Sequence, residues 1–198
     1  QLTGATIKHF GLGYSPNDFG ILTSYLKRLG YTEEEMTAGF LCGISQKTGR
    51  PYDYFRNRVM FPIIDVAGNV VAFGGRVMDD SKPKYLNTSD TPAFKKSRNL
   101  FALNFAKGKC TEKMILCEGY MDVISMHQAG FTNAVASLGT ALTSGHASLL
   151  KRYTQEVLLL YDSDEAGVRA ALRAIPILRE AGLNSRVVNL RPYNCLLY

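Results

Sequence analysis

Two groups of acidic residues in the second half of the chain each follow an apolar segment. Glu118 follows one such segment and Asp122 lies four residues further on, while Asp162 and Asp164 follow another. Carboxylates gathered in one place repel each other unless a cation neutralises them. Oxygen ligands without soft donors favour Mg²⁺ or Mn²⁺, which proteins commonly hold together with substrate phosphates. The pattern therefore predicts a divalent metal site used in phosphoryl or nucleotidyl transfer.

The elements around these acids alternate in a way that would bring the acids together. Apolar, β-branched segments alternate with helical patterns, which predicts right-handed crossovers and a mainly parallel sheet. The carboxyl ends of parallel strands share one edge, where ligands bind. We expect strands at 113–117, 133–137, 156–161 and 185–190, and helices at 120–128, 144–153 and 164–181.

A purely structural reading of the acids is also open. Acidic side chains are common at helix N-termini, where they accept hydrogen bonds from free N–H groups and complement the helix dipole. Asp122 fits that reading as well as it fits a metal site. Glu118 fits it less well, because Gly119 beside it permits a sharp turn and the close approach of a ligand. A cap explains only one of Asp162 and Asp164, so a cation explains the pair better.

The first half of the chain follows a different pattern. We expect a helix at 17–29, a capping box formed by Thr32 and Glu35, a hairpin of strands 59–66 and 70–76, and a helix at 98–107. The predicted fold class is α/β. A mixed α+β subdomain at 1–108 precedes a mainly parallel sheet with flanking helices at 109–198.

Composition limits the possible functions. The chain has 198 residues, 46% hydrophobic and 20% charged, which is typical of a globular protein and not of a disordered one. No apolar run reaches membrane-spanning length and no signal peptide is evident, so we expect no membrane partner and a cytoplasmic location. The four cysteines form no CxxC pair, so we expect no structural zinc.

Positive charge is concentrated in the first half. The net charge is +6, and residues 1–108 hold 14 Lys and Arg against 9 Asp and Glu. Such a surface attracts polyanions, although charged side chains can equally serve only solubility. Charge therefore favours nucleic-acid or nucleotide binding and leaves a solvated surface as the alternative.

The acidic pattern resembles that of a known domain. Glu118-Gly119-Tyr120-Met121-Asp122, followed by an Asp-x-Asp pair on the next strand but one, is similar to the TOPRIM signature of topoisomerases and primases. Other segments resemble, in order, the motifs of bacterial DnaG-type DNA primases. These segments are 55–63, 73–76, 83–87, 91–96 and 133–141.

This resemblance implies a DNA primase catalytic core, a DNA-directed RNA polymerase that makes short RNA primers on single-stranded DNA during replication. It implies that Glu118 lies nearest the chemistry, that Asp162 and Asp164 hold Mg²⁺ or Mn²⁺, and that Asp122 supports them. The implied partners are a single-stranded DNA template, ribonucleoside triphosphates, and the replicative helicase of the primosome through a carboxy-terminal domain missing here. The implied location is the nucleoid. The residues implied to guide template and nucleotide are Arg56, Arg58, Arg76, Lys84, Tyr85 and Lys96.

The chain departs from the family near its end. The family has a third acidic cluster of Asp-Pro-Asp type after the last strand, whereas 194–198 contain no acid. We therefore expect a fragment that lacks the zinc-binding and helicase-binding domains and that binds metal without efficient priming. The alternative function is a single-stranded-DNA-binding fragment with an incomplete metal site. Another TOPRIM enzyme, a nuclease or topoisomerase, fits only the second half.

Overall fold

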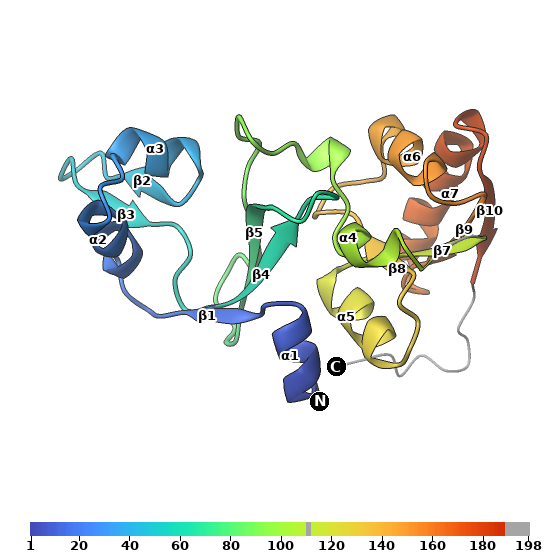
Figure 1. The fold of residues 1–198 in the computed structure, drawn as a ribbon, viewed down its shortest axis with the longest axis horizontal. Helices are drawn as coiled ribbons and strands as arrows, with labels where there is room; N and C mark the ends of the chain where they lie inside the picture. The colour runs from blue at the N-terminus through green and yellow to red at the C-terminus, as the bar shows by residue number, and fades with distance from the viewer. Residues whose placement is uncertain (110–111, 189–198) are drawn as a thin grey trace. The chain divides into compact units, whose positions relative to one another are not determined.

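The structure is a computed structural model, and it describes residues 1–109 and 112–188 (Figure 1). Their contacts divide the chain into two compact units. Unit 1 comprises residues 1–7, 64–70 and 96–198, and unit 2 comprises 8–63 and 71–95. The domain boundary near residue 108 that the sequence suggests stays a prediction.

Unit 1 contains the predicted parallel sheet. Its strands are β7 (Lys113–Cys117), β8 (Ala134–Ala136), β9 (Glu156–Leu160) and β10 (Asn184–Val187), in the order β10-β9-β7-β8. β7 pairs in parallel with both β8 and β9, and β10 pairs in parallel with β9. The carboxyl ends of β7 and β9 are therefore neighbours, since Cys117 pairs with Leu160.

Helices cover both faces of this sheet. They are α5 (Tyr120–Gln128), α6 (Ser144–Lys151) and α7 (Glu165–Glu180). Right-handed crossovers place α5 on one face and both α6 and α7 on the other, where α6 and α7 contact each other. The apolar core between the sheet and α6 and α7 includes Met114, Leu116, Leu150, Leu159 and Leu178.

Unit 2 contains most of a second, four-stranded sheet. Its strands are β1 (Gly13–Ser15), β4 (Arg58–Ile64), β5 (Val70–Val77) and β6 (Tyr85–Asn87), in the order β1-β4-β5-β6. β1 pairs antiparallel with β4, and β5 with β6. The turn between β4 and β5 is closed by a 2.9 Å hydrogen bond from the Asp65 N–H to the Asn69 carbonyl. The predicted hairpin and the predicted α/β class, an antiparallel sheet followed by a parallel one, are confirmed.

A smaller substructure of unit 2 shows one confirmed and one wrong prediction. It combines α2 (Ile21–Arg28) and α3 (Glu33–Ala38) with the hairpin of β2 (Cys42–Ile44) and β3 (Pro51–Asp53). The Thr32–Glu35 capping box begins α3 as predicted. The helix predicted at 17–29 instead begins at Ile21, because Asp18 accepts a hydrogen bond from the Gly20 N–H and forms a turn.

The helix predicted at 98–107 is also wrong in extent. The chain forms a short 3₁₀ turn, η1 (Lys96–Arg98), and then α4 (Leu103–Ala106). Between them Phe101 pairs with Ala136 of β8 in both directions, and Ala102 adopts a positive φ of 64°. Pairing with the sheet edge therefore replaces the first turns of the predicted helix.

A short helix, α1 (Gly4–His9), precedes these elements. None of the helices within 1–109 and 112–188 combines the length and apolar content needed to cross a membrane.

Candidate active site

Glu118 joins the carboxyl ends of two neighbouring strands. It comes directly after β7, whose last residue Cys117 is completely buried, and its own side chain is exposed. The Asp162 backbone N–H, just past β9, donates to Glu118 Oε2 at 3.1 Å. The structure therefore places the first acidic group beside the second, as the parallel strands predict.

Asp122 lies in the first turn of α5 and has a structural role. Its Oδ2 accepts a hydrogen bond from the Gly119 backbone N–H at 3.0 Å. This is one half of a capping box; the other half cannot form because Gly119 has no side chain. The prediction that Asp122 lies at a helix N-terminus and accepts a backbone hydrogen bond is therefore correct. The hydrogen bond uses Oδ2 and does not involve Oδ1.

Asp164 and Asp162 differ in their roles. Asp164 is the N-cap of α7 and accepts a hydrogen bond from the Gly167 N–H at 2.8 Å. Gly167 is buried, and a Cβ atom there would lie only 2.0 Å from the Asp162 carbonyl oxygen. The first turn of α7 thus packs directly on the Asp162 backbone, which fixes the Asp162-x-Asp164 turn. The Asp162 side chain is not needed for this cap.

Neighbouring carboxylates contribute to raised pKa values of Glu118 and Asp122. Burial raises the pKa of Glu118, and the charges of Asp162, Asp164 and Asp122 raise it further. The pKa of Asp122 is also raised, first by burial and then by Asp162. Carboxylates that repel each other in this way gain from a nearby cation.

The donor chemistry fits a hard divalent cation, although the side chains do not converge on one point. Among residues 1–109 and 112–188, no three His, Cys, Asp or Glu side chains are close enough to hold one ion. Glu118, Asp122 and Asp164 each give one carboxylate oxygen to a backbone N–H and have a second oxygen. The place of the expected third acidic cluster, 194–198, lies outside the described residues.

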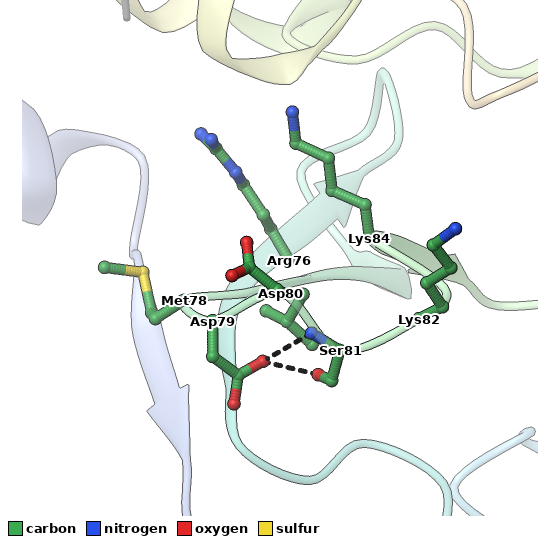
Figure 2. A pocket seen from close by; sticks show the side chains of 8 residues that line it. Arg76, Met78, Asp79, Asp80, Ser81, Lys82 and Lys84 are labelled. Carbon is green, nitrogen blue, oxygen red and sulfur yellow. Dashed lines mark hydrogen bonds between the residues drawn. The ribbon is translucent and has the colours of Figure 1, made fainter.

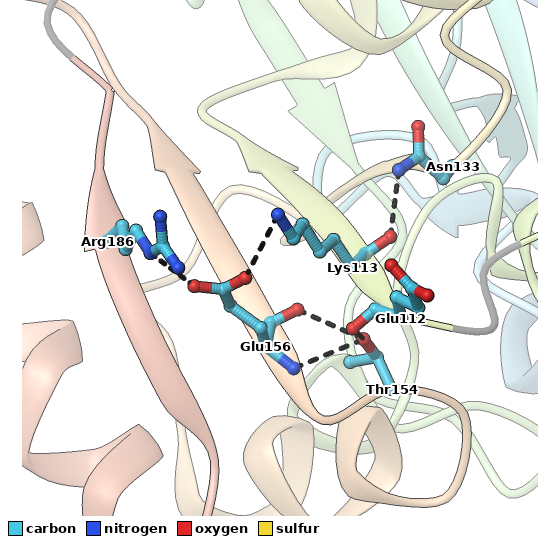
Figure 3. Close-up of polar contacts among 6 residues, drawn as sticks. All are labelled: Glu112, Lys113, Asn133, Thr154, Glu156 and Arg186. Carbon is cyan, nitrogen blue, oxygen red and sulfur yellow. Dashed lines mark hydrogen bonds and ion pairs between the residues drawn. The ribbon is translucent and has the colours of Figure 1, made fainter.

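The opposite edge of the same sheet has compensated charges (Figure 3). Glu156, almost completely buried at the start of β9, pairs with Lys113 at 3.6 Å and Arg186 at 2.5 Å. The Thr154 hydroxyl donates to the Glu112 carbonyl at 2.9 Å. This edge therefore stabilises the sheet, whereas the acids at the other edge have no basic partner that the described residues show.

Two of the predicted nucleotide- and template-binding residues line a pocket in unit 2. The pocket has a volume of about 480 Å³ and is formed by the end of β5 and the loop to β6 (Figure 2). Arg76 and Lys84 lie in its wall, and the Arg76 guanidinium lies 5.8 Å from the centre of the Tyr85 ring. These side chains can bind phosphate groups through charge and offer an aromatic face beside them.

Other residues of this pocket were not predicted from the sequence. Lys82, Asp79 and Asp80 also line it, and Asp79 accepts hydrogen bonds from the Ser81 N–H and hydroxyl. These bonds lower the pKa of Asp79. The Asp-x-Ser spacing is typical of an Asx turn and could have predicted this turn.

Arg56 and Arg58 are held by contacts within unit 2. The Arg56 guanidinium lies 4.4 Å from the Phe19 ring centre and 5.7 Å from that of Tyr52, and donates to the Asp53 carbonyl. Arg58 is buried and donates to the carbonyls of Gly75 at 3.2 Å and Lys84 at 3.4 Å.

Burial lowers the pKa of Arg58, and the charge of Arg56 adds to this effect. Binding of nucleic acid by these two arginines stays a prediction. Their contacts show that both also support the fold.

Lys96, the last of the predicted binding residues, belongs to unit 1. It begins η1, and its backbone carbonyl is bonded to the ring of His146 in α6. The structure thus divides the predicted basic residues between the two units.

Two family models match the chain. The model of the DNA primase catalytic core, N-terminal domain, matches residues 1–107, and a Toprim-like model matches residues 115–194. Among curated proteins, the DNA primase of Clostridium acetobutylicum is 53% identical over 186 residues, covering 93% of this chain and 31% of that protein. The DNA primase of Deinococcus radiodurans is 49% identical over 177 residues, covering 88% of this chain and 31% of that protein. The chain thus spans about a third of the length of these relatives.

Solved structures of DNA primases are also similar to this chain. A crystal structure of a DNA primase domain from Pseudomonas aeruginosa superposes with a TM-score of 0.86 at 42% identity, covering 94% of this chain and 60% of that one. A structure of the DnaG primase catalytic domain bound to single-stranded DNA gives a TM-score of 0.84 at 38% identity, with coverage of 94% and 60%.

Proposed function

The chain belongs to the DNA primase catalytic core family, and on that premise we propose that it is the core of an enzyme that synthesises short RNA primers on single-stranded DNA. The observation that carries this proposal is the junction of Glu118 with Asp162 at the carboxyl edge of the parallel sheet. At this edge burial and then the charges of Asp162, Asp164 and Asp122 raise the pKa of Glu118, and the acids lack basic partners among the described residues. The activity is that of a DNA-directed RNA polymerase, acting with the replication machinery in the cytoplasmic nucleoid.

The acids would hold the metal of this reaction. Glu118, Asp162 and Asp164 would bind Mg²⁺ or Mn²⁺, with Asp122 in support. A bound ion supplies Lewis-acid polarisation of the α-phosphate and lowers the pKa of the attacking ribose hydroxyl. Glu118 is also suited to accept a proton, because a raised pKa makes a carboxylate a better general base.

The basic residues would bind the substrates. Arg76 and Lys84 would neutralise phosphate groups in the pocket of unit 2, and Tyr85 would stack on a base. Lys96 would add a positive charge in unit 1. The related catalytic domain bound to single-stranded DNA supports DNA as template. We further propose that a carboxy-terminal domain outside this chain binds the replicative helicase.

The second candidate function is single-stranded DNA binding without synthesis. Arg76 and Lys84 in the wall of the unit 2 pocket favour it, because these side chains can bind phosphate groups without a metal ion. Template-dependent incorporation of labelled ribonucleotides separates the two functions when measured on this chain and on the longer parent protein. We expect the parent to make primers and Glu118→Gln in the parent to bind DNA normally while making none. Undiminished primer yield from that variant would remove Glu118 from its proposed role.

A further inference from the structure

His146 connects α6 to the backbone of Lys96. Its side chain is completely buried, and its Nε2 atom lies 2.7 Å from the Lys96 carbonyl oxygen. Its Nδ1 atom accepts a hydrogen bond of 3.2 Å from the Thr143 backbone N–H. Both ring nitrogens are therefore used, one to cap α6 and the other to hold η1.

These partners determine the protonation state of the ring. Nδ1 accepts a backbone N–H and so has no proton, and a carbonyl can only accept, so the proton lies on Nε2. Burial lowers the pKa of His146, and the backbone hydrogen bonds to Lys96 and Asn99 oppose this effect. The bond to Lys96 is thus a directed N–H to carbonyl bond of fixed tautomer.

Two further contacts bring η1 against the start of α6. The Thr143 hydroxyl donates to the Ser97 carbonyl at 2.9 Å. A Cβ atom on Gly145 would lie 2.6 Å from the same carbonyl oxygen, so only glycine allows this approach. Three residues of one four-residue segment, Thr143, Gly145 and His146, therefore fix the backbone of residues 96 and 97.

We infer that His146 is a positioning residue that holds the Lys96 backbone so that the Lys96 side chain meets an anionic nucleic-acid ligand. This inference rests on the proposed function, because it assumes that Lys96 contacts the template or nucleotide. His146 itself touches no ligand. The two hydrogen bonds of His146 use different ring nitrogens, so conservative substitutions can test each bond separately.

Two amide side chains reproduce different halves of the ring. Glutamine places an N–H group near the position of Nε2 and can still donate to the Lys96 carbonyl. Asparagine places an oxygen near the position of Nδ1, so it can accept the hydrogen bond from the Thr143 N–H but cannot donate to the Lys96 carbonyl. If the bond to Lys96 is what matters, His146→Gln retains ligand binding and His146→Asn loses it.

The test is fluorescence anisotropy with a labelled single-stranded oligonucleotide as the probe, over a range of salt concentrations. We expect Lys96→Ala to weaken binding several-fold and to reduce the log–log salt slope by about 0.7. His146→Asn should do the same, and His146→Gln should resemble the wild type. The double variant His146→Asn/Lys96→Ala should bind no more weakly than Lys96→Ala alone, since coupled residues are not additive.

His127 provides a matched control. It is also a buried histidine of unit 1, with Nε2 at 2.9 Å from the Ala134 carbonyl. His127→Asn should change thermal stability without changing the salt slope. If His146→Asn does not fold, Gly145→Ala keeps the histidine but displaces the Ser97 carbonyl, and should weaken binding in a Lys96-dependent way.

Three results would overturn the inference. Equal binding by His146→Asn and His146→Gln, or effects of His146→Asn and Lys96→Ala that add fully, would reduce His146 to a structural residue. Wild-type binding by Lys96→Ala would overturn the role of Lys96 and this inference together. Primer synthesis by the parent protein would still support the proposed function in each of these cases.

Discussion

Replacing Gly167 with alanine should disrupt the acidic edge by a calculable amount. The new Cβ would lie 2.0 Å from the Asp162 carbonyl oxygen, where 3.0 Å is the closest that real contacts allow, so the two must separate by about 1 Å. Such overpacking costs about 1–3 kcal/mol. Moving Asp162 also breaks its bond to Glu118, and a hydrogen bond to a charged group contributes about 1.5–3 kcal/mol. Alanine regains about 1 kcal/mol of helix propensity.

The net expected loss is about 1.5–5 kcal/mol, a fall in Tm of about 3–20 °C for a chain of this size. Differential scanning calorimetry measures it, and Mn²⁺ titration of the folded variant should show weaker binding. Gly4→Ala is the matched control, because nothing lies within 4 Å of its Cβ position in α1, and it should not lower Tm. Wild-type Tm and metal affinity in Gly167→Ala would contradict the packing of α7 on Asp162.

Other changes test the charges. Glu118→Gln should raise Tm in EDTA at pH 7, because a folded-state pKa above the unfolded value of about 4.3 means that stability is lost as pH rises through both values. Solvent screens this exposed group, so we expect less than about 1 kcal/mol, and the difference from wild type should vanish below about pH 4 in calorimetry. Arg58→Met should lower the free energy of unfolding by about 2–4 kcal/mol in urea, because the carbonyls of Gly75 and Lys84 lose a charged donor. Arg76→Ala should leave that free energy nearly unchanged and reduce the log–log salt slope of single-stranded DNA binding by about 0.7. The same loss of stability in both variants would contradict the assignment of Arg58 to the fold and of Arg76 to DNA binding.

The second half of the fold could be predicted closely from the sequence. The bounds of β7 and α5 agree with the predicted ranges, because buried strands and amphipathic helices differ in hydrophobic period. The start of α2 could not be predicted, because its N-terminal N–H groups at Leu22 and Thr23 bind the carboxylate of Asp53, some thirty residues away. Long-range partners of this kind leave no local signal.

The candidate site was predictable in its location more than in its details. The positions of the strand ends predicted Glu118 beside Asp162, but the sequence could not decide between a helix cap and a metal ligand for Asp122. Nor could it show that Arg58 is buried beneath Gly75. The Thr143-x-x-His146 spacing is that of a capping box and could have drawn attention to His146.

The most direct test of the account is a Mn²⁺ titration followed by the electron paramagnetic resonance signal of the free ion. If the acidic edge of the sheet holds the metal, Glu118→Gln, Asp162→Asn and Asp164→Asn should each bind Mn²⁺ more weakly than the wild type. Glu156→Gln, at the opposite edge of the sheet, should bind it equally well as long as it remains folded. The same Mn²⁺ affinity in the wild type and in all three acidic-edge variants would place the metal elsewhere and contradict the account.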